Sequence, residues 1–167
     1  MAPTVAAKNQ KTEPLKIGLD AEFRAEMSQR LSGILANTYQ LTIKTHIYHW
    51  NVVGPLFKPF HELTEDHYNA LFAATDIIAE RIRALDHFAP EDVSLVNFAP
   101  RAKDANAKTA EHMIGDLISD HEAAVRTMRE AAAFAGEADD VVTADMLTAR
   151  LTFHEKALWM LRAMVAK

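Results

Sequence analysis

The feature that most limits the fold of this chain is the stretch of residues 60–87, which contains neither glycine nor proline. Proline removes a backbone hydrogen-bond donor and glycine costs conformational entropy in a helix, so their absence permits one long uninterrupted helix. The apolar residues recur at helical spacings, which is the pattern of an amphipathic helix. These residues are Leu63, Ala70, Leu71, Ala74, Ile78, Ile82 and Leu85. The sequence therefore predicts a helix from about residue 59 to residue 87.

Three further segments show the same period and have recognisable ends. The first follows Asp20, a residue type that caps helix N-termini, and ends at Gly54-Pro55. Another extends from about residue 107 to residue 135, where Gly136 is expected to close it. The last begins near residues 141–143, where Asp139-Asp140 is expected to cap it, and continues almost to residue 167.

The connection between the second and third helices is too long for a tight turn. Residues 89–101 hold Pro90 and Pro100 around a short apolar piece, so we expect a short extra helix there. Four helices, three of them roughly 40 Å long, joined by one central crossover predict an all-α, ferritin-like four-helix bundle. With 167 residues and 49% hydrophobic content, the chain can bury one sizeable core. We place this single domain at residues 19–167.

Residues 1–18 differ in composition from the rest of the chain. They contain Lys8, Lys11 and Lys16, two prolines and no sustained apolar period, so we expect a flexible N-terminal arm. Its lysines outnumber its one acidic residue, Glu13, and several such arms on one oligomeric particle could bind DNA by avidity. A solubilising tail is the alternative, because the formal net charge of the whole chain, -5, opposes binding to a polyanion.

The composition also excludes several classes of site. There is no cysteine, so disulfides and thiolate metal sites are ruled out. No stretch approaches the roughly 18 to 20 consecutive apolar residues that span a bilayer, and residues 1–19 lack the apolar centre of a secretory signal. We expect a soluble cytoplasmic protein with no membrane partner.

A series of residues with metal-binding side chains accompanies the two first helices: His49, His61, Glu65, Asp76 and Glu80. At about 100° per residue, the last four point at roughly 0°, 40°, 60° and 100° around the second helix and share one stripe. Mixed imidazole and carboxylate ligands suit Fe, Zn or Mn better than Ca or Mg. A solvated or salt-bridged helix face is the alternative interpretation.

The spacing of this stripe indicates two half-sites. Glu65 and Asp76 lie roughly 16 Å apart along one helix, whereas metal ligands must converge within about 2 Å of the ion. The four positions are symmetric about residues 70 and 71, so two antiparallel copies related by a two-fold axis would place His61 beside the partner subunit's Glu80. Glu65 would likewise lie beside the partner subunit's Asp76. An intra-bundle di-iron site is disfavoured, because no histidine has a glutamate three residues before it.

A longer signature surrounds these ligands: His49-Trp50-Asn51, Gly54, Phe57, His61-Glu62, Glu65, Tyr68, Asp76 and Ala79-Glu80-Arg81. It resembles that of the Dps (DNA-protection-during-starvation) miniferritins, and the helical pattern extends the resemblance over about residues 20–165. The resemblance implies a hollow shell of twelve subunits with di-iron ferroxidase centres between two-fold-related subunits. It also implies that Fe(II) is oxidised preferentially by hydrogen peroxide and stored inside as a ferric mineral, which protects the cell and its DNA from oxidative damage.

The resemblance assigns roles to individual residues. His49, His61 and Glu65 would come from one subunit, and Asp76 and Glu80 from its partner. Trp50, also expected in the catalytic set, would intercept stray oxidising equivalents; a buried packing role is its alternative, and both can hold. Glu65 stands where many relatives carry Asp, and Asp86 occupies a helix end where glycine would be expected.

Several other polar residues have structural interpretations. His46 fits a surface or interface position, and His67 falls off the ligand stripe and is expected to be structural. His121 and His154 lie on apolar faces, as core or inter-helix histidines do. Asp116 and Asp120, one turn apart, fit a solvated helix face or, as the resemblance allows, an iron pore at a three-fold axis.

The leading functional hypothesis is therefore a ferroxidase and iron-storage particle with Fe(II) and hydrogen peroxide as substrates. One alternative is a nucleoid-associated DNA-binding protein in which the metal site is secondary. Another is a helical bundle that holds structural zinc without redox activity.

Overall fold

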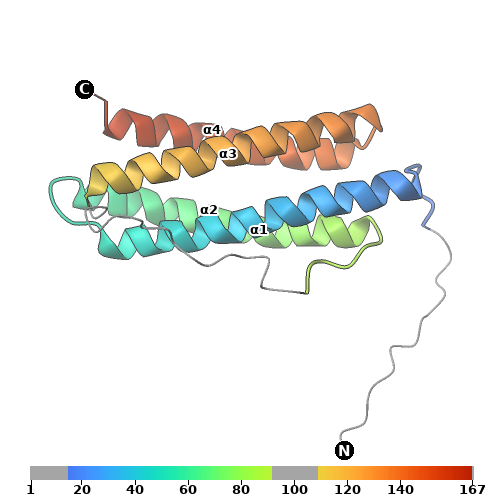
Figure 1. Ribbon diagram of the computed structural model, residues 1–167, viewed down its shortest axis with the longest axis horizontal. Coiled ribbons are helices and arrows are strands. Elements are labelled where there is room, and N and C mark those ends of the chain that lie inside the picture. The colour runs from blue at the N-terminus through green and yellow to red at the C-terminus, as the bar shows by residue number, and fades with distance from the viewer. Residues whose placement is uncertain (1–14, 92–108, 167) are drawn as a thin grey trace, which may run out of the picture.

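The computed structural model describes residues 15–91 and 109–166. The described part is all-α and consists of α1 (Ala21–Asn51), α2 (Phe57–Ala84), α3 (Ala110–Glu137) and α4 (Val141–Met164). Figure 1 shows the four helices side by side in one elongated bundle, in which α1 packs mainly on α2 and α3 on α4. The predicted bundle is confirmed. Most of the predicted arm, and all but the first residues of the connection expected to hold a short helix, lie outside the described residues.

The ends of α2 and α3 are set by aspartates in the left-handed backbone region. Asp86 has φ 70° and Asp139 has φ 58°. In both places two backbone hydrogen bonds form a Schellman motif. After α3, Asp139 N–H donates to Gly136 O at 3.2 Å, and Asp140 N–H donates to Ala135 O at 2.9 Å. The position of Asp86 thus has the conformation for which glycine was expected.

One predicted helix end needs correction. α3 continues through Gly136 to Glu137, because the left-handed residue that closes the helix is Asp139. Asp20 stands at the N-cap of α1 as predicted, although its side chain makes no capping hydrogen bond. The predicted cap of α4 is confirmed, since the Asp140 carboxylate accepts from Thr143 N–H at 3.0 Å.

The core is divided into two apolar clusters along the bundle. The first contains Met27, Leu31, Ile34, Leu35, Ala74, Ile78, Ile82, Leu85, Met128, Ala131, Ala135 and Leu147. The second contains Leu41, Tyr48, Val52, Phe60, Leu63, Leu71, Ala110, Met113, Ile114, Leu117 and Leu161. Between them on α3 and α4 lies a buried polar layer formed by His121 and His154, and the buried His67 of α2 lies beside His121. No helix in the described ranges is long and apolar enough to cross a membrane.

Candidate metal centre

The structure brings together the two histidines that the sequence separates by a helix end, a loop and a helix start. His49 lies in the last turn of α1, and His61 lies in the second turn of α2. The Nδ1 atom of His49 is 2.9 Å from the carbonyl oxygen of His61, and Nδ1 of His61 is 2.8 Å from the carbonyl oxygen of His49. The two rings are stacked, with centroids 3.7 Å apart and planes 18° apart.

These reciprocal contacts decide which nitrogen of each ring is available. A backbone carbonyl oxygen only accepts hydrogen bonds, so both Nδ1 atoms must carry the proton and donate. A neutral imidazole protonated at Nδ1 keeps an unshared pair at Nε2. A ligating histidine commonly donates its other ring N–H to a carbonyl or a carboxylate in this way, which fixes its tautomer and ring orientation. Both histidines are therefore prepared to bind a metal through Nε2.

The predicted carboxylates lie on α2 but do not gather in one place. Glu65 is one turn after His61, and Asp76 and Glu80 are one turn apart from each other; all three carboxylates are exposed. Roughly 16 Å of helix separates Glu65 from Asp76. Within residues 15–91 and 109–166, no three His, Asp or Glu side chains are grouped so that they could hold a metal ion. The full five-residue ligand set stays a prediction.

Trp50 is 61% exposed in the single chain, so there it is not a buried packing residue. Its ring lies 4.2 Å from the ring of His46, which also stacks on Tyr68 at 4.2 Å. Tyr68 in turn meets His49 edge to face at 5.3 Å. Tyr68 is the residue for which sequence reasoning found no role, although it follows His61 by two helical turns and so shares its face.

Asp116 and Asp120 are neither free nor simply solvated. Lys44 on α1 places its Nζ 3.1 Å from Asp116 and 2.6 Å from Asp120, and the hydroxyl of Tyr48 donates to Asp116. Burial, together with the hydrogen bond to Asp116, raises the pKa of Tyr48. The face is partly exposed, as a solvated face would be, and the lysine offsets part of its negative charge within the chain.

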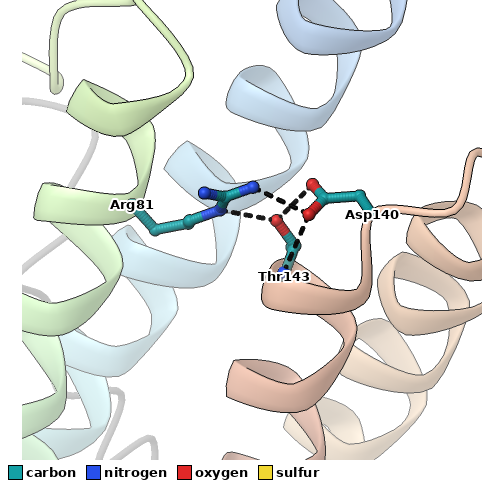
Figure 2. Close-up of polar contacts among 3 residues, drawn as sticks. All are labelled: Arg81, Asp140 and Thr143. Carbon is teal, nitrogen blue, oxygen red and sulfur yellow. Dashed lines mark hydrogen bonds and ion pairs between the residues drawn. The ribbon is translucent and has the colours of Figure 1, made fainter. Parts of the chain in front are cut away.

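Arg81, the residue after Glu80, connects α2 to the start of α4 through Asp140 and Thr143, and we call this contact the clamp (Figure 2). Arg81 Nη2 is 2.7 Å from Asp140, and Arg81 Nε donates to the Thr143 hydroxyl at 2.8 Å. Burial alone would raise the pKa of Asp140, but hydrogen bonds from Thr143 and the charge of Arg81 hold it below its usual value. The clamp fixes the end of α2 that carries Asp76 and Glu80.

Comparison with known proteins identifies the family of this chain. A family profile described as Ferritin-like domain matches residues 28–167, which defines the class of protein. An uncharacterized low temperature-induced protein of Nostoc sp. is 37% identical over 90% of this chain and 86% of its own length. A DNA protection during starvation protein of Brevibacillus brevis is 33% identical over 77% of this chain and 87% of its own. The structure of Dps from Thermosynechococcus elongatus superposes with a TM-score of 0.80 at 30% identity, covering 88% of this chain and 94% of that one. The chain belongs to the Dps miniferritins of the ferritin-like family.

Proposed function

We propose that this chain is the subunit of a dodecameric shell, and that the shell oxidises Fe(II) with hydrogen peroxide and stores the ferric product. Its ferroxidase centre would be built from His49, His61 and Glu65 of one subunit and from the partner subunit's Asp76 and the partner subunit's Glu80. The observation that carries the proposal is the reciprocal bonding of the two histidines, which leaves both Nε2 atoms free beside an exposed carboxylate stripe.

The surface of α2 supports the requirement for a second copy. Phe72 falls in the middle of the ligand stripe, at roughly 20° from His61, and is 63% exposed. Ile77 is also exposed, at 50%, but it points roughly 140° away from Phe72 around the helix and lies off the stripe. A large apolar side chain exposed among metal-binding residues is expected to be covered by another protein. A two-fold contact would cover Phe72 and bring the two half-sites together.

The chemistry follows from the donor set. Fe(II) is the substrate, and imidazole nitrogen with carboxylate oxygen suits it better than it suits Ca or Mg. Two ferrous ions each give up one electron, and hydrogen peroxide accepts both as its O–O bond breaks, so no hydroxyl radical is released. The carboxylates stabilise the charge gained on oxidation. Trp50, which is exposed and one residue from His49, would intercept stray oxidising equivalents.

The first test is rapid mixing of the protein with Fe(II) and peroxide, followed by absorbance of the ferric product. The double variant His61→Ala, Glu65→Ala should lose the rapid phase. Asp66→Ala is the matched control, because Asp66 is an exposed carboxylate next to Glu65 but roughly 100° around the helix. Rapid oxidation at the wild-type rate in the double variant would exclude the proposed centre.

A second test asks whether the centre is shared. Subunits carrying His61→Ala, Glu65→Ala are unfolded, mixed with subunits carrying Asp76→Ala, Glu80→Ala and reassembled. Each parent should be inactive. In a random mixture half of the dimers are mixed, and each mixed dimer regains one intact centre of two, so about a quarter of the wild-type activity should return. No recovery despite mixed assembly would show that the five residues do not form a shared site.

A further inference from the structure

The polar layer between the two apolar clusters contains a directly bonded histidine pair. Nδ1 of His121 on α3 lies 2.8 Å from Nδ1 of His154 on α4. Their exposed fractions are 0% and 1%. One ring must donate its Nδ1–H and the other must accept, so one Nε2 is a donor and the other an acceptor. Both Nε2 atoms are buried without a partner.

Within the part of the chain that the structure describes, no carboxylate contributes to the environment of either ring. From α2 the pair faces His67, whose ring centroid is 5.8 Å from that of His121, and from α4 it faces Arg150. The nearby side chains of α1 are the neutral Asn37 and Thr38. Lys44, further along α1, is paired with Asp120. A divalent cation would therefore be poorly accommodated, and no three ligands converge here among the described residues.

A small cavity lies against His154 of the pair. It has a volume of about 10 Å³, close to the space for one water molecule. Residues of α1, α3 and α4 line it, including Asn37, Thr127 and His154. Asn37 and Thr127 are exposed, whereas His154 is buried. The cavity thus lies between exposed residues of α1 and α3 and one histidine of the pair.

We propose that His121 and His154 form a proton-operated switch that loosens the α3–α4 hairpin from α1 and α2 in mildly acidic conditions. A first proton on the free Nε2 creates an imidazolium without a counter-ion, beside His67 and Arg150. A second proton forces two N–H groups to face each other, which breaks the bond between the rings. Both charged states are stabilised when the polar layer opens to water, because burying a charge without a partner is costly.

Burial acts on both rings in the direction that this geometry implies. It lowers the pKa of His121 well below the ordinary histidine value of about 6.5, with the charges of His154, His67 and Arg150 adding to the effect, and it lowers the pKa of His154 likewise, with Arg150 and His67 adding. The open form therefore binds more protons below about pH 6.5, and the closed form loses stability as the pH falls below that value. When the pH falls from 7 to 5, each histidine raises the equilibrium constant for opening of the hairpin about 25-fold, and the pair raises it roughly 600-fold.

The test is hydrogen–deuterium exchange on the assembled full-length protein at pH 7 and pH 5, corrected for intrinsic exchange rates. Protection in α3 and α4 near His121 and His154 should fall by orders of magnitude in the wild type. In His154→Gln this fall should be about 25-fold smaller, whereas His112→Gln, which removes an exposed histidine of α3, should match the wild type. Equal pH dependence in all three proteins would overturn the proposal.

A second measurement does not depend on the variants folding. The ring nitrogen resonances of the ¹⁵N-histidine-labelled wild type should show the N–H···N pair neutral in the folded state at pH 5. Charged imidazoles in a folded and protected bundle at that pH would contradict the switch. Neither experiment involves iron, so the outcome is independent of the proposed ferroxidase.

Discussion

Replacing Arg81 with alanine should strongly destabilise the bundle, because Asp140 would be left buried and unpaired. The side chains of Arg81 and Asp140 are 12% and 1% exposed. Breaking a buried ion pair by removing one partner costs about 3–5 kcal/mol. Arg81 retains some solvent contact, and Thr143 would still donate to the carboxylate. We therefore expect a loss of about 2–4 kcal/mol in the free energy of unfolding.

The assay is urea unfolding at pH 7 and a fixed subunit concentration, since assembly makes apparent stability depend on concentration. Arg30→Ala is the control: Arg30 forms an ion pair with Glu26 on the same helix, but the two side chains are 39% and 48% exposed. Such a pair is worth only about 0.3–0.5 kcal/mol. A loss in Arg81→Ala no larger than that in Arg30→Ala would refute the reasoning.

The clamp also predicts a pH dependence. The folded-state pKa of Asp140 is lowered, so its contribution to stability is present above the unfolded pKa of about 3.9 and is lost as the pH falls through the folded value. Asp140→Asn should remove this acid-sensitive contribution. In the double variant with Arg81→Ala, the two losses should not add, because the residues contact each other directly.

Three further outcomes follow from individual residues. Phe72→Lys should leave the subunit folded but weaken each two-fold contact by about 2 kcal/mol. Light scattering should then report smaller particles, and Fe(II) oxidation should slow. An unchanged particle mass would argue against a contact at Phe72. Asp139→Gly should raise the free energy of unfolding by about 0.5–1 kcal/mol, because glycine adopts a positive φ without strain, and calorimetry would detect a decrease if the reasoning were wrong. Deleting residues 1–18 should abolish DNA retardation in gels at low salt if the arm binds DNA; retardation that survives the deletion would assign binding to the bundle.

Much of the fold was readable from the sequence. The long stretch without glycine or proline became α2, and its apolar period identified the buried side, since Leu71, Ala74, Ile78 and Ile82 are all fully buried. Helical period and capping depend on residues within a turn or two of each other, so they are visible locally. The same locality explains the error at Gly136. Its residue type suggested a helix end, but the Schellman bonds that end α3 form three residues later.

The prediction of two half-sites also came from the sequence, because phase and rise along one helix need no tertiary information. Contacts between helices did not. Helical period shows which side of a helix is buried, but not which partner residue lies opposite, because that depends on the register and rotation of two packed helices. Only the tertiary structure could show that His49 and His61 hold each other's rings, that Arg81 reaches Asp140, or that Lys44 offsets Asp116 and Asp120. The bonding of His121 to His154 was likewise decided by packing, and it turned two histidines on apolar faces into one coupled, buried pair.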